Sequence, residues 1–209
     1  MNRTELLKPV VGILRGIDPG FFPELMAASF AAGLSAIEVT VNTAGAFGMV
    51  STTRPRVPEG CLLGMGTIRN PDEGRAAIEA GAMFLVTPNL DPAVIELARK
   101  QKLPIIAGAF TPSEVYRAWA AGADLVKVFP CGGLGPGYIR ELRGPFDHIP
   151  MVAVGGVKEE NVAEYLAAGA VGVGVGTSLF GREAIAARDP RAIEKNVAEF
   201  LARAGVGKG

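Results

Sequence analysis

The side chains with the clearest chemical use are three charged residues within or directly after short apolar runs: Arg15, Glu38 and Lys127. Lys127 is the most informative, because the run from Leu125 to Phe129 is otherwise apolar. An ammonium group is disfavoured in such surroundings, so we expect the pKa of this lysine to be lowered and more neutral amine to be present. A neutral amine attacks a carbonyl carbon to give a carbinolamine and then an iminium, which withdraws electrons from the adjacent carbon.

The other two charged residues complement such a lysine. Glu38 lies between Ile37 and Val39, where burial predicts a raised carboxyl pKa suited to both giving and taking a proton near neutrality. Arg15 offers a planar fork of donors that fits a substrate carboxylate. Together the three predict carbon–carbon bond chemistry on a 2-keto acid. The alternative is a buried ion pair with a purely structural role.

Glycines after two apolar runs predict a phosphate site. Gly155-Gly156 follows one run, and Gly174-Val175-Gly176-Thr177-Ser178 closes the last one before a further helix. Glycine lets the backbone approach an anion, and amides at a helix start can bind it. A Gly-Gly pair alone usually marks only a turn, but the second glycine cluster favours phosphate.

An internal repeat shows how these residues are positioned. Four segments share a helix end, a glycine and a short aliphatic run, with the glycines at Gly33, Gly81, Gly122 and Gly169, spaced 48, 41 and 47 residues apart. Each glycine fits the left-handed position that closes a helix. The runs lack alternation, which is typical of strands buried on both faces of a parallel sheet.

The spacing leaves room for two strand–helix units per repeat, so four further strands are expected. They are found over 9–15, 61–67, 104–111 and 150–156, and helices are predicted over 23–32, 72–80, 92–100, 112–121 and 159–168. An eightfold alternation predicts a compact (β/α)8 TIM barrel, in which functional groups gather at the carboxyl ends of the strands. A doubly wound open sheet is disfavoured, because no Gly-x-Gly-x-x-Gly follows the first strand.

The chain is expected to be one barrel domain over residues 1–209. Residues 182–204 are predicted to form one closing helix, and residues 205–209 a frayed tail. No linker or low-complexity segment divides the sequence.

Composition excludes several classes of protein. With 49% hydrophobic and 20% charged residues, the chain is neither disordered nor membrane-spanning. Lys plus Arg equals Asp plus Glu at 21 each, which gives no reason to expect nucleic acid. Two cysteines and one histidine leave little for a disulfide framework or a metal site. The cysteine count and the absence of a signal peptide favour a cytoplasmic location.

An ordered set of motifs from Val10 to Ser178 resembles the 2-keto-3-deoxy-6-phosphogluconate / 4-hydroxy-2-oxoglutarate aldolase family. The matching segments are Gly12-Ile13-Leu14-Arg15, Ile37-Glu38-Val39-Thr40, Gly64-Met65-Gly66-Thr67, Val86-Thr87-Pro88-Asn89, Thr111-Pro112-Ser113-Glu114, Lys127-Val128-Phe129-Pro130, Val154-Gly155-Gly156 and Gly176-Thr177-Ser178. Each segment is ordinary alone, but the ordered set is highly specific.

The resemblance implies a class I aldolase that reversibly cleaves a phosphorylated 2-keto-3-deoxy acid to pyruvate and glyceraldehyde 3-phosphate. It needs no cofactor or metal and is typically a homotrimer, with no nucleic acid or membrane partner. The implied catalytic residues are Lys127, as the Schiff-base lysine, and Glu38, as the general acid/base. The implied binding residues are Arg15 and Thr67 for the pyruvyl carboxylate, Pro88, Thr111 and Phe129 around the iminium, and Gly155, Gly156, Gly176 and Ser178 for phosphate.

Two departures resemble the 2-dehydro-3-deoxy-6-phosphogalactonate branch of this family. Asn42 stands where gluconate-type members usually carry arginine, and Val154 where they carry threonine before the Gly-Gly pair. Valine removes a hydrogen bond to the substrate's C4 hydroxyl, and such losses shift discrimination by ~1–3 kcal/mol. Asn42 and Val154 are therefore the predicted specificity residues, although relaxed specificity fits as well.

Three alternatives remain at this stage. The chain could act on 4-hydroxy-2-oxoglutarate, or it could be a phosphate-binding barrel of another class, such as a sugar-phosphate epimerase or a synthase. Those barrels need metal ligands or several acidic strand ends, and Glu38 is the only carboxylate within a predicted strand. A barrel kept as a binding module has no need of isolated charges on its strands.

Overall fold

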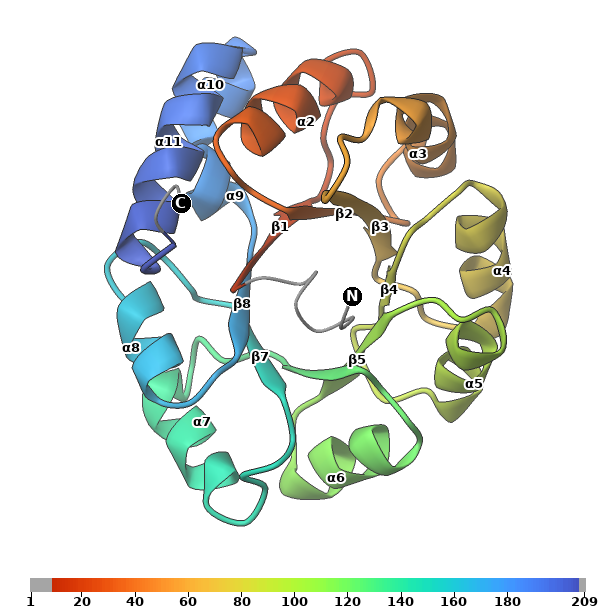
Figure 1. The fold of residues 1–209 in the computed structure, drawn as a ribbon, viewed down its shortest axis with the longest axis vertical. Coiled ribbons are helices and arrows are strands. Elements are labelled where there is room, and N and C mark those ends of the chain that lie inside the picture. The colour runs from red at the N-terminus through yellow and green to blue at the C-terminus, as the bar shows by residue number, and fades with distance from the viewer. Residues whose placement is uncertain (1–8, 207–209) are drawn as a thin grey trace.

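A computed structural model describes residues 9–206 of the chain. Within them, eight parallel strands close into a barrel in which each strand pairs with the next along the chain and β8 pairs with β1. Figure 1 shows the ring of strands with the helices arranged around its outside. The predicted (β/α)8 barrel is therefore confirmed. The start of the predicted domain and positions 207–209 of the predicted tail lie outside the described residues.

The strands are short and close to their predicted positions. They are β1 (Val10–Leu14), β2 (Ala36–Thr40), β3 (Leu62–Gly66), β4 (Leu85–Val86), β5 (Ile105–Ala109), β6 (Leu125–Val128), β7 (Met151–Val154) and β8 (Gly172–Val175).

The helices that connect and cover them are α2 (Phe22–Ala31), α3 (Ala46–Thr53), the short 3-10 helix η1 (Arg54–Arg56), α4 (Pro71–Glu79), α5 (Pro92–Lys100), α6 (Pro112–Ala120), α7 (Gly135–Arg143), α8 (Val162–Ala167), α9 (Thr177–Phe180), α10 (Arg182–Ala187) and α11 (Pro190–Arg203). No helix in residues 9–206 is both long enough and apolar enough to cross a bilayer.

The prediction of a single closing helix over 182–204 is wrong. The segment divides at Arg188, whose backbone is left-handed at φ +51°, and α11 begins after it. The Asp189 side chain accepts hydrogen bonds from the backbone N–H groups of Arg191 and Ala192, and Pro190 occupies the first turn. Asp-Pro is a helix-start signal, because aspartate caps the helix and proline lacks an N–H that would need a partner.

The repeated glycines close helices as the sequence predicts. Gly33, Gly81, Gly122 and Gly169 all have φ between +93° and +101°, which glycine adopts without steric cost. Each chain reversal then leads directly into a strand. This local chemistry sets where each strand begins, and hence which side chains reach its carboxyl end.

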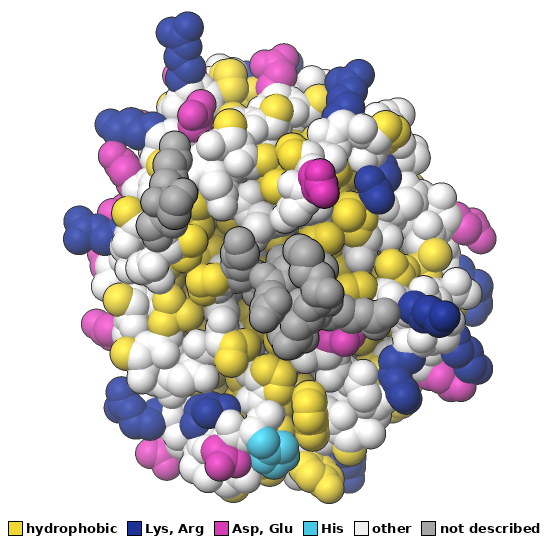
Figure 2. Space-filling model, in the orientation of Figure 1, with side chains coloured by type: hydrophobic (Ala, Val, Ile, Leu, Met, Phe, Trp, Pro, Cys, Tyr) yellow, Lys and Arg dark blue, Asp and Glu magenta, His cyan; other side chains and the backbone are white. Residues whose placement is uncertain are grey.

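The apolar core has two parts. The larger lies between strands and helices and includes Val126, Leu63 and Val173. The smaller consists of residues on or beside the strands: Val11, Ala36, Leu62, Phe84, Val86, Ile106, Leu125, Val152 and Val154. On β6 the two kinds alternate, so Leu125 and Lys127 face into the barrel while Val126 and Val128 face the helices. On the face shown in Figure 2, charged side chains stand mainly around the rim.

Candidate active site

A cavity of about 600 Å3 opens at the carboxyl ends of the strands. Its lining residues are Ile13, Arg15, Glu38, Thr67, Pro88, Lys127, Phe129, Val154, Gly155, Gly156, Val157, Lys158, Gly174, Gly176 and Ser178. They come from β1, β2, β6, β7, β8 and the segments that follow strands. The closed barrel thus brings together residues up to 165 positions apart in the chain.

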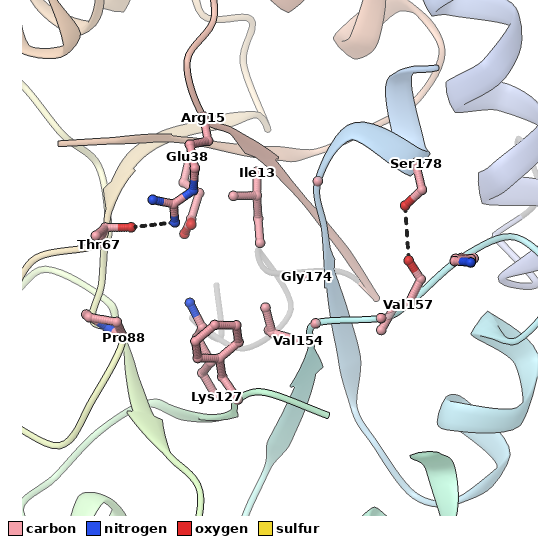
Figure 3. A pocket seen from close by; sticks show the side chains of 15 residues that line it. Ile13, Arg15, Glu38, Thr67, Pro88, Lys127, Val154, Val157, Gly174 and Ser178 are labelled. Carbon is pink, nitrogen blue, oxygen red and sulfur yellow. Dashed lines mark hydrogen bonds between the residues drawn. The ribbon is translucent and has the colours of Figure 1, made fainter. Parts of the chain in front are cut away.

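Lys127 projects into this cavity from β6 and is only 6% exposed (Figure 3). Burial lowers the pKa of its ammonium group, the nearby Arg15 lowers it further, and Glu38 opposes the shift. Its Nζ atom lies 4.9 Å from the centre of the Phe129 ring. The sequence-based prediction of a lysine with a lowered pKa is confirmed, and such a lysine has more neutral amine for attack on a carbonyl.

Glu38 enters the cavity from β2, on the side opposite Lys127 (Figure 3). Burial raises the pKa of its carboxyl, against smaller opposing effects of Lys127 and Arg15. Among the residues described, its Oε1 is the buried side-chain polar atom that has no hydrogen-bond partner. A carboxyl that is 1% exposed and incompletely bonded is suited to proton transfer rather than to structural support.

A glycine on the neighbouring strand makes room for this carboxyl. A Cβ atom added to Gly66 would lie 2.3 Å from Oε1 of Glu38, far inside van der Waals contact. Any side chain on β3 at this point would therefore displace the Glu38 carboxyl.

Lys127 and Glu38 influence each other electrostatically without forming an ion pair. No salt bridge joins the two side chains, both of which belong to the described part of the chain. Both line the same cavity. A structural pair would hold the amine against the carboxylate. Here the amine faces open space instead, which favours the catalytic interpretation over the structural one.

The end of the cavity near β1 and β3 is held by a side-chain network. The guanidinium of Arg15 donates from Nη1 to Oδ1 of Asn42 at 3.0 Å and from Nη2 to Oγ1 of Thr67 at 3.1 Å. Thr67 has φ +60°, which is strained for a β-branched residue. This backbone places its hydroxyl against Arg15 (Figure 3). The arrangement fixes a cationic fork suited to a carboxylate.

Pro88 reaches the cavity wall because β5 carries a glycine beside it. A Cβ added to Gly108 would lie 2.4 Å from the carbonyl carbon of Pro88. The hydroxyl of Thr87 donates to the carbonyl oxygen of Asn89 at 2.7 Å and accepts from the N–H of Gly108 at 2.8 Å, which ties the segment to β5. Pro88 is therefore a fixed apolar wall of the cavity that Lys127 also lines.

The opposite end of the cavity is built mainly from backbone. Gly155 and Gly156 follow β7 with φ of +92° and +73°, and a Cβ on Gly156 would lie 2.5 Å from Cα of Gly132. Gly176 and Ser178 follow β8 and line the same end. The hydroxyl of Ser178 donates to the carbonyl oxygen of Val157 at 3.0 Å (Figure 3). This end can receive an anion close to main-chain amides.

Most of the residues predicted to form the site line the cavity, and two do not. Thr111 is not among the lining residues and caps α6: its hydroxyl donates to Oε2 of Glu114 and accepts from the Glu114 N–H, and its predicted place beside the iminium stays a prediction. Asn42 is not a lining residue, but its Oδ1 accepts a hydrogen bond from Arg15, which does line the cavity. The Thr111 hydroxyl is bonded within one helix turn, and the Asn42 amide is bonded to Arg15, 27 residues away.

Three lining residues were not predicted: Ile13, Val157 and Lys158. Ile13 could have been found by extending the two-residue alternation along β1. Lys158 carried the clearer signal, since it is a charge directly after the Gly155-Gly156 turn at a strand's carboxyl end. In the described chain no cluster of three or more His, Cys, Asp or Glu residues is arranged to hold a metal ion.

Comparison with known proteins gives consistent matches. The family model for KDPG and KHG aldolase, named for 2-keto-3-deoxy-6-phosphogluconate and 4-hydroxy-2-oxoglutarate, matches residues 7–196. A probable 2-dehydro-3-deoxy-6-phosphogalactonate aldolase of Rhizobium meliloti is 38% identical over 83% of this chain and 82% of its own length. A 2-dehydro-3-deoxy-phosphogluconate aldolase of Pseudomonas aeruginosa is 33% identical over 79% of this chain and 74% of its own.

A solved structure extends the likeness to three dimensions. The KDPG aldolase of Legionella pneumophila, with pyruvate captured at low pH as a covalent carbinolamine intermediate, superposes with a TM-score of 0.86 at 25% identity. The match covers 94% of this chain and 96% of that one.

Proposed function

This chain belongs to the KDPG and KHG aldolase family, and on that premise we propose the reaction that its cavity carries out. It is a class I aldolase that reversibly cleaves a 2-keto-3-deoxy-6-phospho sugar acid to pyruvate and glyceraldehyde 3-phosphate. The observation that carries the assignment to particular residues is the pair Lys127 and Glu38, both buried, facing one cavity and not bonded to each other.

The first half of the reaction forms the iminium. The neutral Nζ of Lys127 attacks the C2 carbonyl carbon, and protonated Glu38 gives a proton to the departing hydroxyl, so that water leaves the carbinolamine. The lowered pKa of Lys127 provides the neutral amine, and the raised pKa of Glu38 keeps a proton available. Arg15, held by Asn42 and Thr67, binds the substrate carboxylate and so orients C2 toward the amine.

The second half breaks the carbon–carbon bond. Glu38, now ionised, removes the proton of the C4 hydroxyl, directly or through a water molecule. The C3–C4 bond cleaves with its electron pair moving into the iminium, and glyceraldehyde 3-phosphate leaves. The resulting enamine takes a proton at C3 from Glu38, and hydrolysis releases pyruvate and free Lys127. Pro88 and Phe129 supply apolar walls to the cavity in which the iminium forms.

Borohydride reduction in the presence of pyruvate tests this assignment. Reduction of the iminium leaves pyruvate attached through a stable secondary amine, and we expect peptide mapping to find it on Lys127. Lys127→Ala is the matched control and stays unlabelled. An inert wild-type protein, or an adduct on another lysine, would overturn the assignment.

Two features support a preference for the galactonate epimer. Val154 lines the cavity at the position where the gluconate-type members resembled above carry threonine, and the galactonate relative is more similar to this chain than the gluconate relative. Asn42 contributes indirectly, by holding Arg15. A side-by-side cleavage assay of both phosphorylated epimers and of 4-hydroxy-2-oxoglutarate, coupled to pyruvate release, tests the preference. Faster cleavage of the gluconate epimer would contradict it.

We also propose that the protein is a cytoplasmic homotrimer acting on small molecules alone, without metal or cofactor. The family resemblance supports this, and so do the two cysteines, which are too few for a disulfide framework. Light scattering of the purified protein is expected to give three times the mass of the 21.7 kDa chain, and activity is expected to survive exhaustive treatment with a chelator.

A further inference from the structure

The phosphate end of the cavity lacks a charge among the residues so far assigned to it. Gly155, Gly156 and Gly176 offer only backbone groups, and the Ser178 hydroxyl is donated to the carbonyl oxygen of Val157 (Figure 3). A phosphate ester carries about −1.5 to −2 charges at neutral pH. Backbone amides stabilise such an anion, and a cation nearby adds a charge-assisted hydrogen bond.

Three cationic side chains line the cavity, and two of them have other roles in the proposed reaction. Arg15 is bonded to Asn42 and Thr67 at the carboxylate end. Lys127 has to be neutral when it attacks the carbonyl. The third is Lys158, on the loop between β7 and α8, two residues after Gly156. Within the described residues its ammonium group is not committed to an ion pair or hydrogen bond, and Glu38 is the sole acidic residue of the lining.

The loop that carries Lys158 is fixed at two points by one side chain. Oδ1 of Asn161 accepts from the backbone N–H of Lys158 at 2.8 Å, and Nδ2 of Asn161 donates to the carbonyl oxygen of Gly156 at 3.0 Å. The next residue, Glu159, is bonded to Arg203 on α11 at 3.2 Å. The backbone of Lys158 is therefore held beside the glycine turn, while the neighbouring carboxylate is bonded to another cation.

From these observations we propose that Lys158 binds the phosphate group of the substrate and selects phosphorylated over unphosphorylated 2-keto-3-deoxy sugar acids. Asn161 positions it by fixing the loop backbone. The proposal rests on the aldolase function proposed above and adds the cation of its phosphate end. Arg15 then binds one anionic end of the substrate and Lys158 the other, with Lys127 between them.

The test compares two substrates that differ only in the phosphate group. For Lys158→Gln we expect kcat/KM for the phosphorylated acid to fall about 10-fold, mainly through KM, because an exposed charge pair of this kind contributes modestly. The ratio of kcat/KM between phosphorylated and unphosphorylated acids falls by the same factor. Lys158→Arg is expected to retain most of the ratio, because the charge remains.

Controls separate this proposal from the function on which it rests. Lys195→Gln, an exposed lysine on α11, is expected to leave the ratio unchanged. An unchanged ratio in Lys158→Gln, or an equal loss on both substrates, would overturn the role of Lys158 even though wild-type protein is still labelled by pyruvate and borohydride. Failure of wild-type protein to be labelled would overturn the aldolase function itself.

Discussion

On β6, Leu125 and Lys127 face the same barrel interior two residues apart, and on β2 Ala36 and Glu38 do the same. Leu125 and Ala36 belong to the apolar cluster inside the ring, which we call the lower layer. Lys127 and Glu38, together with the lining residues of the cavity, form the upper layer. Residues of both layers border one small void between them, among them Ile106, Val152 and Lys127.

The two layers meet opposite physical requirements with the same backbone. Complete burial of a side chain such as Leu125, which is 1% exposed, contributes about 1.5–3 kcal/mol to stability. Burial of a charge without a close partner costs stability, and the shifted pKa values of Lys127 and Glu38 express that cost. The lower layer therefore holds the barrel closed, while the upper layer keeps groups in a reactive state.

The largest effect on activity is expected from replacing a charged side chain of the upper layer with an apolar one, as in the lower layer. Lys127→Met removes the nucleophile, and we expect kcat to fall at least ~10^3-fold. Because burial lowers the pKa of Lys127 below its ordinary value of 10.5, its charge opposes folding at neutral pH. The variant is therefore expected to unfold at higher denaturant than wild type near pH 7, and this difference shrinks as the pH rises toward 10.5. Urea titrations at several pH values measure it.

Leu125→Ala is the matched change in the lower layer. It removes buried methyl groups and is expected to lower the free energy of unfolding by about 2–5 kcal/mol while kcat changes little. A large loss of kcat in Leu125→Ala at a temperature where it is fully folded would show that the two layers are not separable.

Glu38→Gln is expected to have the next largest effect. Loss of a proton shuttle lowers rates by about 10^2–10^4-fold. The carboxylate raises the pKa of Lys127, so its removal is expected to lower that pKa further. The midpoint in the pH dependence of borohydride labelling with pyruvate is therefore expected to move to lower pH than in wild type. A midpoint that moves upward would contradict the electrostatic coupling of the two residues.

The sequence predicted the lower layer and the barrel better than the upper layer's details. Apolar runs, closing glycines such as Gly81 and helix caps are local signals, so the strands and the helices α2, α4, α5, α6 and α8 were found within a few residues. The isolated charges of Lys127 and Glu38 were visible for the same reason. Asn42 accepts a hydrogen bond from Arg15, 27 residues away, and that contact depends on three-dimensional packing. Thr111 and Glu114 instead form a capping box within one helix turn, which the Thr-x-x-Glu pattern already indicates.

Two glycines on β3, one beside each layer, allow the effect of a single added methyl group to be compared between the layers. Gly66→Ala brings a Cβ to 2.3 Å from Oε1 of Glu38, whereas Gly64→Ala brings one to 2.5 Å from the ring of Phe84 in the lower layer. We expect Gly66→Ala to lower kcat about 10- to 100-fold by displacing the carboxyl. Gly64→Ala is expected to lower the free energy of unfolding by about 1–3 kcal/mol through overpacking, with kcat nearly unchanged.

Steady-state kinetics and urea unfolding of the two glycine variants, measured together, provide the comparison. Equal losses of kcat in both variants would mean that Gly66 is not needed to keep the Glu38 carboxyl in place.

The smallest expected effect is at Val154, which belongs to both layers: it is part of the apolar cluster and lines the cavity. Val154→Thr replaces a methyl with a hydroxyl of nearly equal size, so the barrel stays packed while the cavity gains a donor near the substrate's C4 hydroxyl. We expect the ratio of kcat/KM for the gluconate epimer over the galactonate epimer to rise about 5- to 10-fold, which corresponds to roughly 1–1.4 kcal/mol. The added threonine hydroxyl is buried, and its burial is favourable only where it has a hydrogen-bond partner. A partner on the gluconate epimer alone therefore favours cleavage of that epimer alone. A ratio that stays constant while stability falls would place Val154 in the lower layer only.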